Sequence, residues 1–386
     1  MSLPGQDSSG DRFPAAPGRD LLRTVDLALA DLRRGGVVVV DGGPGRAALA
    51  LAAETATGDA LRRLRETAPG DAGVVMPRPR AAALGLAPEG LGPVILAPQA
   101  PLTAGTLRAL ADPAAHGPVD PAHWTVLTAT GSESAEGTAM DLAKLARLMP
   151  VVVVVGLDTD VAPDAAEWAA ARGLRWVRSA QVQDYAEAAA RTLHPVAEAK
   201  VPLADAPDAR VIAFRPGGGE VEHLAIVVGT LPEGEPPLVR LHSECFTGDV
   251  LASLRCDCGE QLRGALRIMS EAGGGILVYL AQEGRGIGLV NKLRAYALQD
   301  EGVDTFDANE LLGFGPDDRL YLPAAEILRH LGVDAVRLLS NNPEKAEALA
   351  ECGIEVVDRV PHAFPANGHN DFYLMTKARR QGHRIG

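Results

Sequence analysis

Apolar runs alternate with amphipathic segments along the chain, in the order helix then strand. Residues 20–34 space their apolar side chains as a helix does, and Gly35 and Gly36 end that helix before the apolar run 37–40. The order recurs at 139–155, where Pro150 separates a helical pattern from five valines. Continuous apolar strands beside amphipathic helices are typical of sheets covered on both faces, so we predict an α/β fold with mixed sheets.

The length of 386 residues predicts two domains, and a hydrophobic content of 47% suffices for two cores. Helical patterns at 164–171 and 182–193 complete a first domain over 20–194. Residues 195–208, which contain three prolines, are expected to be a linker, and residues 1–19, rich in Gly, Pro, Ser and Asp, a disordered tail. The second domain is expected over 209–386, with strands at 211–214, 224–230, 238–242, 276–280, 335–339 and 354–357 and helices at 259–271, 288–299, 324–330 and 343–351.

Charge and composition exclude several classes of function. A net charge of −13 argues against a nucleic-acid or membrane-surface binder, although a local cluster of Arg and Lys can still hold a small anion. We expect no membrane span, because no apolar run approaches eighteen residues, and no signal peptide, because the N-terminus lacks an apolar run. The four cysteines do not resemble a secreted disulfide framework, so we expect a cytoplasmic protein.

The most informative feature is a cluster of three cysteines, Cys245, Cys256 and Cys258, far from the fourth at Cys352. Three thiolates with an open fourth position suit a zinc ion that activates water. We expect Cys256 and Cys258 on one side of an extended segment, with a turn at 247–249 returning Cys245 to them. Three buried free cysteines are the alternative, which the polar neighbours disfavour. His242 as a fourth ligand would make the site structural instead.

Three further motifs can bind anions. Residues 282–288 are glycine-rich, lie between a strand and a helix, and offer Arg285, although their spacing fits neither a Walker loop nor a dinucleotide fingerprint. Lys292 and Tyr296 share the face of the next helix, where a solvated lysine is the alternative. Residues 313–319 are either a site or a solvated turn. Ser340 and its neighbours either cap a helix or hold a phosphate near Lys345.

Taken in order, these motifs resemble those of the GTP cyclohydrolase II family over about residues 210–382. The matching segments are 240–249, 255–261, 282–285, 292–299, 312–314, 317–319 and 341–345. The resemblance implies hydrolysis of GTP to 2,5-diamino-6-(5-phosphoribosylamino)pyrimidin-4(3H)-one with release of formate and pyrophosphate, the first step of riboflavin biosynthesis. It also implies one Zn²⁺ on Cys245, Cys256 and Cys258, Mg²⁺ with the triphosphate, and a homodimer.

The resemblance assigns roles to individual residues. Tyr296 acts in proton transfer or holds the reacting ring, and Asp317 assists Arg319. Arg319 is either a nucleophile toward the α-phosphorus or an electrostatic stabiliser, since a guanidinium is normally protonated. Many relatives carry Thr at Ser340, which keeps the hydroxyl. The implied substrate-binding residues are Arg240, Leu241, His242, Ser243, Glu244, Gln261, Glu283, Gly284, Arg285, Thr305, Ser340 and Lys345.

The first domain resembles a degenerate 3,4-dihydroxy-2-butanone-4-phosphate synthase domain, on traces at 31–36, 51–54 and 140–150. That family needs an acidic stretch for magnesium, and the equivalent residues 43–48 here read Gly-Pro-Gly-Arg-Ala-Ala. Its Gly-His-Thr-Glu-Ala motif has become Ser-Ala-Glu-Gly-Thr at 134–138. Because enediol chemistry needs acidic ligands, we predict that this domain is inactive as a synthase and serves packing, dimerisation or regulation.

Two alternatives to the full reaction follow from the same motifs. One is a variant that releases a formylated pyrimidine, against which Tyr296 argues. The other is a non-catalytic, zinc-stabilised nucleotide-binding regulatory protein. Three thiolates with Tyr296, Asp317 and Arg319 all in place weigh against that alternative, because a binder has no need of an open metal site.

Overall fold

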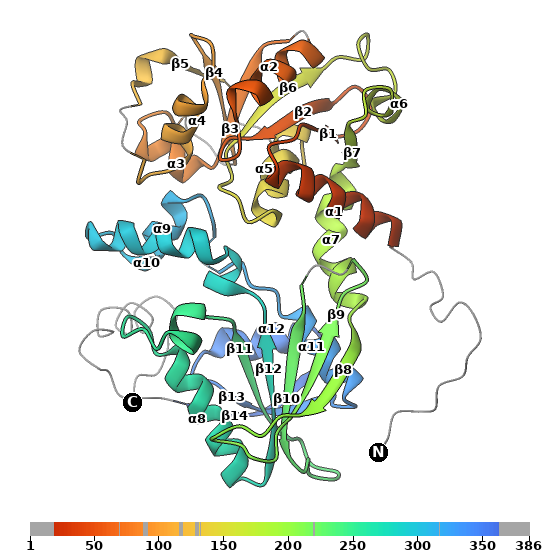
Figure 1. Cartoon of the computed structure of the whole chain (residues 1–386), viewed down its shortest axis with the longest axis vertical. Coiled ribbons are helices and arrows are strands. Elements are labelled where there is room, and N and C mark those ends of the chain that lie inside the picture. The colour runs from red at the N-terminus through yellow and green to blue at the C-terminus, as the bar shows by residue number, and fades with distance from the viewer. Residues whose placement is uncertain are drawn as a thin grey trace.

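The computed structural model describes residues 19–68, 70–87, 92–115, 119–127, 131, 133–218, 221–315 and 317–362. The expected tail lies outside these residues except for Arg19, as does the second domain beyond His362. Two seven-stranded sheets form, one in each half of the chain (Figure 1). The predicted α/β fold with two domains is confirmed.

The first sheet has the strand order β5-β4-β3-β6-β2-β1-β7, and only its β1–β7 pair is parallel among the pairs described. Its central strand β6 shows why helices cover both faces. Val152 and Val154 enter one core, and Val153 and Val155 enter the other, as the alternation of strand side chains requires. The strands are β1 Val38–Asp41, β2 Ala47–Ala52, β3 Ala72–Met76, β4 Val94–Pro98, β5 Trp124–Val126, β6 Val152–Leu157 and β7 Arg175–Arg178.

The two cores of the first domain are closed by different helices. One face packs against α1 (Arg19–Arg33), α5 (Ala135–Leu145) and α7 (Ser179–Arg191). The opposite face packs against α2 (Gly58–Thr67), α3 (Arg78–Ala83), α4 (Ala104–Ala111) and α6 (Ala165–Ala170).

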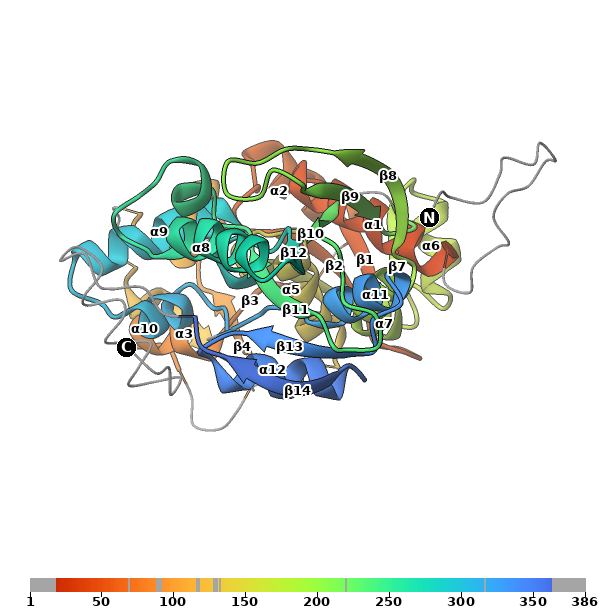
Figure 2. The ribbon, with the colours of Figure 1, turned by 90° about the horizontal axis from the view of Figure 1, so that it is seen from below.

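The second sheet has the order β14-β13-β11-β12-β10-β9-β8, in which β14, β13, β11 and β12 run parallel and the rest antiparallel. Helices α11 (Leu322–His330) and α12 (Pro343–Glu351) cover one face, and α8 (Cys258–Glu271) covers the other (Figure 2). The strands are β8 His194–Lys200, β9 Arg210–Arg215, β10 His223–Gly229, β11 Leu238–Ser243, β12 Gly274–Leu280, β13 Ala335–Leu339 and β14 Glu355–Val360.

The segment expected as a linker over 195–208 differs from that expectation. Residues His194–Lys200 form β8, which pairs with β9 at the edge of the second sheet. An edge strand tolerates Pro195, because only one side of it pairs, and the register shifts between Pro195 and Ala197. The second domain therefore begins at the end of α7 without an intervening linker.

Helices α9 (Leu289–Asp300) and α10 (Thr305–Leu311) form a small core of their own and lie between the two domains in Figure 1. The chain after α10 touches the first domain closely. A Cβ on Gly313, which has φ +86°, would lie 2.7 Å from the Cγ of Pro150. A glycine here allows both the left-handed turn and the contact between domains.

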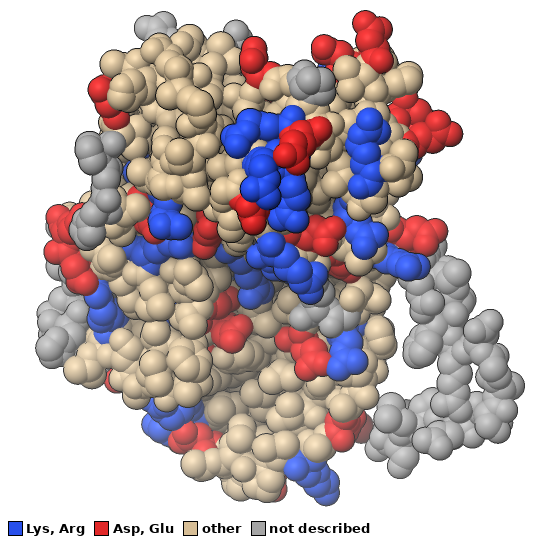
Figure 3. Space-filling model, turned by 45° about the horizontal axis from the view of Figure 1, so that its top comes forward, with Lys and Arg blue, Asp and Glu red and all other residues tan. Residues whose placement is uncertain are grey.

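Among the described residues, no helix has the length and apolar character needed to cross a membrane. On the face drawn in Figure 3, Lys and Arg side chains gather near the middle of the molecule with Asp and Glu among them.

Candidate active site

The three cysteines meet at the end of β11. Cys245 follows that strand, and Cys258 is the first residue of α8. The three Sγ atoms all lie within 4.8 Å of one another, and those of Cys245 and Cys256 are 3.8 Å apart. The predicted extended segment is wrong: Asp257 has φ −96° and ψ 4°, and the turn into a helix brings Cys256 and Cys258 together.

A short helical turn, Phe246–Val250, carries Gly248 against the thiols. A Cβ on Gly248 would lie 2.8 Å from the Sγ of Cys256 and 3.1 Å from that of Cys245. Glycine therefore leaves free the space between the sulfur atoms. Three converging thiols are soft ligands of the kind that zinc prefers, so the residues present suit the metal that the sequence predicts.

Asp249 holds the cysteine loop in position. Its carboxylate accepts hydrogen bonds from the Cys245 backbone N–H at 3.0 Å and the Tyr279 hydroxyl at 2.9 Å, and it lies 3.0 Å from the His242 Nε2. His242 is buried and stacks on Tyr279. Among the described residues the metal-ligand group contains the three cysteines and not His242, which favours the open site over the closed structural one.

Lys292 lies inside the site and is not the solvated lysine of the alternative interpretation. Its ammonium is 3.0 Å from the Cys245 Sγ and 2.8 Å from Glu283 Oε1, and its side chain is 12% exposed. Hydrogen bonds from the thiols of Cys256 and Cys258, with a smaller contribution from Lys292, lower the pKa of Cys245 despite burial. A thiolate is the form that a metal binds.

Glu283 connects the cysteine loop to the glycine-rich loop. Its carboxylate accepts hydrogen bonds from the backbone N–H of Phe246 at 2.6 Å and of Gly284 at 2.9 Å, in addition to its ion pair with Lys292. It is 4% exposed. In this structure Glu283 is thus bound on both oxygens by protein groups.

The loop at 282–288 has the left-handed backbone that its glycines predict. Gly284 and Arg285 both have φ +63°, and Gly286 and Gly288 are also positive. The carbonyl of Arg285 accepts a hydrogen bond from the Asp318 backbone N–H at 3.2 Å. This contact joins the glycine-rich loop to the loop that carries Asp317 and Arg319.

Asp317 and Arg319 form an ion pair. The Arg319 Nε lies 2.7 Å from Asp317 Oδ1, and the Arg319 backbone N–H donates to the same oxygen at 3.1 Å. Burial raises the pKa of Asp317, but the bonds from Arg319 and the nearby Arg285 outweigh it, so the pKa lies below its ordinary value. The carboxylate is therefore ionised and the guanidinium is held in place.

A second buried polar group lies at Arg240. Its guanidinium donates to the Leu339 carbonyl at 2.8 Å and to the Gln261 side-chain oxygen, whose amide nitrogen in turn donates to Asp257. Burial lowers the pKa of Arg240 to about 10, which still leaves it charged near neutral pH. His362 Nε2 contacts the Gln261 carbonyl at 2.9 Å.

The start of α12 has the helix cap that its sequence predicts. Asn342 caps the helix, with its side chain accepting from Glu344 N–H at 2.9 Å, and Ser340 Oγ accepts from Asn342 N–H at 3.1 Å. Lys345 is buried and donates to the carbonyl of Leu241 at 3.1 Å, so β11 and α12 are joined beside the cysteines.

The remaining predicted residues surround this centre. Tyr296 lies under the Arg255 guanidinium, 4.5 Å from the ring centroid, with the Lys292 ammonium at 5.8 Å. Glu244 is half-buried, and burial followed by the nearby Glu283 raises its pKa. Ser243 ends β11. The side chain of Thr305 lies outside the described part of the chain.

The sequence did not predict the contacts on the other face of α9. Arg294 lies 3.0 Å from Glu54 Oε1 and 3.3 Å from Asp112 Oδ2, both in the first domain, and it donates to Asn291 Oδ1 at 2.7 Å. Asn291 also donates to the Arg147 carbonyl at 3.1 Å. One helix thus presents Lys292 to Cys245, with Tyr296 near Lys292, and its other face to the first domain.

Comparison with known proteins gives a family model that matches the second half of the chain and relatives that match most of it. The family model described as GTP cyclohydrolase II matches residues 194–361. A protein named GTP cyclohydrolase-2 from Azospirillum brasilense is 54% identical over 362 residues, which cover 94% of each chain. The riboflavin biosynthesis protein RibBA of Phocaeicola vulgatus is 40% identical over 297 residues, 73% of this chain and 72% of that protein.

A solved structure also aligns with both domains. A two-domain 3,4-dihydroxy-2-butanone 4-phosphate synthase from A. baumannii covers 87% of this chain and 98% of its own, at 20% identity and a TM-score of 0.35.

Proposed function

Because the chain belongs to the GTP cyclohydrolase II family, whose members are hydrolases, we propose that it converts GTP to 2,5-diamino-6-(5-phosphoribosylamino)pyrimidin-4(3H)-one in riboflavin biosynthesis. Formate and pyrophosphate are released. The observation that carries the proposal is the convergence of three thiols around a space kept open by Gly248, with Lys292 and Tyr296 beside them.

Cys245, Cys256 and Cys258 would hold one Zn²⁺. When bound, the ion would lower the pKa of a water molecule, so that a hydroxide is available near neutral pH to attack the imidazole carbon of guanine. The protein prepares these ligands: Asp249 fixes the Cys245 loop through its backbone N–H, and Lys292 places a positive charge 3.0 Å from the Cys245 Sγ. The Lys292 contact favours the thiolate form of Cys245, and the Asp249 contact fixes the direction of this ligand.

Tyr296 and Lys292 are the groups that can move or hold a proton at the opened imidazole ring. They share one face of α9, and cations at Lys292 and Arg255 lie near the Tyr296 ring. These cations hold the Tyr296 ring in position, which suits a role in proton transfer or in holding the reacting ring.

Arg319 acts as an electrostatic stabiliser at the α-phosphoryl group. Its pair with an ionised Asp317 keeps the guanidinium charged and oriented, which suits developing negative charge better than nucleophilic attack. Arg285, Ser340 and Lys345 complete the phosphate contacts, with Mg²⁺ on the triphosphate. Gln261, backed by Arg240, reads the guanine edge.

The first domain serves as a brace for α9 and not as a synthase. Arg294 carries a charge in an interface where its own side chain is 18% exposed, and two carboxylates of the first domain, Glu54 and Asp112, neutralise it. Glu54 also accepts the Met149 N–H at 2.8 Å, so both its oxygens are engaged in packing. This support fixes the helix that carries Lys292 and Tyr296. We further propose a cytoplasmic homodimer.

The deciding experiment measures formate and pyrophosphate released from GTP by the zinc-loaded protein, with the pyrimidine product followed by mass. One of each per GTP is the expected result. Pyrophosphate without formate would establish the formylated-pyrimidine variant. Binding of zinc and GTP with no release of either product would overturn the proposal in favour of a regulatory nucleotide binder.

A further inference from the structure

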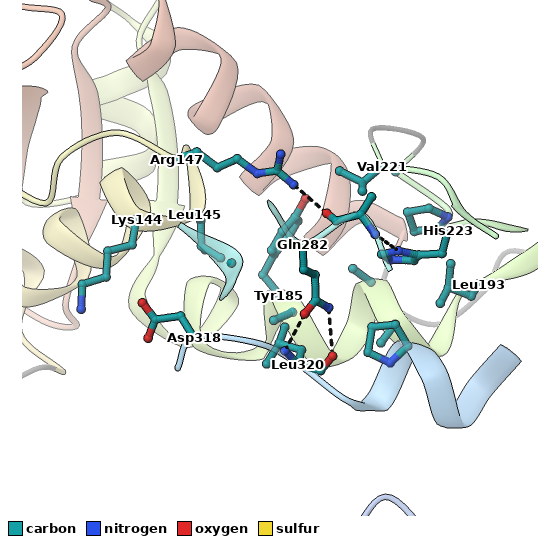
Figure 4. A pocket seen from close by; sticks show the side chains of 18 of the residues that line it. Lys144, Leu145, Arg147, Tyr185, Leu193, Val221, His223, Gln282, Asp318 and Leu320 are labelled. Atoms are coloured by element: carbon teal, nitrogen blue, oxygen red, sulfur yellow. Dashed lines mark hydrogen bonds between the residues drawn. The ribbon is translucent and has the colours of Figure 1, made fainter. Parts of the chain in front are cut away.

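A cavity of about 260 Å³ lies between the two domains, and none of the three cysteines lines it (Figure 4). One wall is the end of α5 with one face of α7. The opposite wall comes from the second domain, at the β9–β10 connection, the end of β12 and the loop before α11. Concave sites between domains are where proteins commonly bind small ligands.

The cavity exists because α7 presents small side chains to it. Leu193 lines it just beyond the helix, and Ala186, Ala189 and Ala190 line it at spacings of three and four residues, which places these alanines on one helical face. Methyl groups at these positions leave a gap against Pro323 and Phe314 that larger side chains would fill. This part of the wall can accept an apolar body.

Arg147 reaches the cavity from an unusual backbone position. It follows the α5 C-cap at Ala146 with φ +59°, and its N–H bonds the Lys144 carbonyl at 2.8 Å while Leu148 N–H bonds Ala143 O at 2.9 Å. Glycine normally fills this position of a helix C-terminal motif, because a side chain there costs free energy. The arginine instead extends across the domain boundary, where its Nη2 donates to the Ala281 carbonyl at 3.1 Å.

The charges around the cavity favour an anion. Lys144 and Arg147 line it on the side of the first domain, and Asp318 is the carboxylate opposite. Asp318 already accepts the Gly315 backbone N–H at 3.2 Å. Among the lining residues, two cations face one carboxylate, and Asp141, outside the lining, also interacts with Lys144, so Arg147 supplies most of the positive charge available to a ligand.

His223 adds a directed donor. It is 7% exposed, and its Nδ1 accepts the Ala281 backbone N–H at 3.1 Å, so the ring hydrogen must be on Nε2. Burial, followed by repulsion from Arg147, lowers the pKa of His223 to about 4, which keeps the ring neutral near pH 7. The Nε2–H of this lining residue can therefore donate to a ligand oxygen.

We propose that this cavity binds a small organic anion, with an apolar ring or chain against the alanines of α7 and a carboxylate or phosphate held by Lys144 and Arg147. Its wall includes Gln282, Gly286 and Asp318, which belong to the two loops that carry Arg285 and Arg319. A bound ligand therefore contacts those loops, and by shifting their position it changes the rate of GTP turnover. This coupling depends on the proposed function, whereas binding itself does not.

Calorimetry of the full-length, zinc-loaded protein with 1-naphthyl phosphate as the probe tests the binding. We expect a Kd tighter than about 1 mM, and binding at least about tenfold weaker in Ala189→Leu, where a longer side chain fills the cavity. Lys144→Gln should weaken the binding of 1-naphthyl phosphate and leave the binding of the uncharged analogue 1-naphthol unchanged. Because phosphate esters can also enter a GTP site, Ala189→Leu is the variant that identifies this cavity.

Equal binding by wild type and both variants, or none at all, would overturn the proposed site. The coupling is measured as the rate of formate release with and without the probe. The probe should change this rate in wild type and leave it unchanged in Ala189→Leu. A rate that the probe leaves unaltered in wild type overturns the coupling alone. If Ala189→Leu does not fold, the charge dependence seen with Lys144→Gln decides.

Discussion

The two domains differ in what their polar side chains do. In the second domain, Asp249, Glu283 and Lys292 each contact the cysteine loop or a thiol. In the first domain, Glu54 contacts a backbone N–H and an arginine of the neighbouring domain. Both sheets nevertheless have seven strands, and an apolar core packs against each face of each sheet. A sheet requires only apolar residues in the right alternation, whereas a reaction site requires particular groups, so the sheet of the first domain tolerates replacement of individual polar side chains.

The largest effect should follow from Cys256→Ser, which removes a ligand from the second domain. We expect loss of zinc and a fall in GTP turnover of more than about a hundredfold, because even the loss of a group that only orients a metal's ligands costs about ten- to a hundredfold. Metal analysis measures the loss of zinc, formate release measures the fall in turnover, and circular dichroism shows whether the variant remains folded.

Cys352→Ser is the matched control, since Cys352 lies outside the thiol cluster and should leave zinc and turnover unchanged. If the Cys256→Ser protein unfolds as a whole, the metal is structural, and the cysteines serve folding and not a reaction site in the second domain.

A smaller effect should follow from Arg294→Ala, which breaks the contact between the domains. We expect kcat to fall between about tenfold and a hundredfold with zinc retained, because a small displacement of a catalytic helix is costly. Glu54→Gln should act in the same direction, and the double variant should lose less than the sum of both, since the side chains touch.

Arg62→Ala provides the comparison, because Arg62 forms exposed ion pairs within the first domain and surface pairs contribute little. An unchanged kcat in Arg294→Ala would contradict the proposal that the first domain holds α9 in position. A rise in KM alone would assign Arg294 to substrate binding instead.

No effect at all is expected when ribulose 5-phosphate and Mg²⁺ are given to the protein. The residues at 43–48 offer no carboxylate for magnesium, so the substrate should remain unconsumed above the rate without protein. Clear metal-dependent turnover in a coupled assay would contradict the contrast on which the other predictions rest.

The sequence predicts the elements with strong local signals. The valine run at β6, the helices α1 and α8, and the convergence of Cys245, Cys256 and Cys258 all appear as expected. Each depends on periodicity or on residue type within a short segment. The prediction of an extended segment at Cys256 and Cys258 was wrong. A strand and a turn into a helix can both bring residues two positions apart together, so the spacing of the cysteines does not distinguish them.

Features that depend on distant partners could not be predicted. Strand β8 is almost wholly exposed and carries Pro195, so nothing local distinguishes it from a linker. The contact of Arg294 with Glu54 spans 240 positions. Only the residue type gave a signal, since an arginine among apolar positions of a helix needs a carboxylate somewhere.

The direct passage from α7 into β8 has a mechanical consequence. Only Thr192 and Leu193 separate the two, and both are tied down: Thr192 Oγ1 accepts the Gly217 N–H at 2.9 Å, and the Leu193 carbonyl contacts His330 Nε2 at 2.7 Å. A hinge needs residues whose dihedral angles can change freely, and this junction has none to spare. A displacement of α7 should therefore pass directly to the edge strand of the second sheet, so the junction couples the positions of the two sheets.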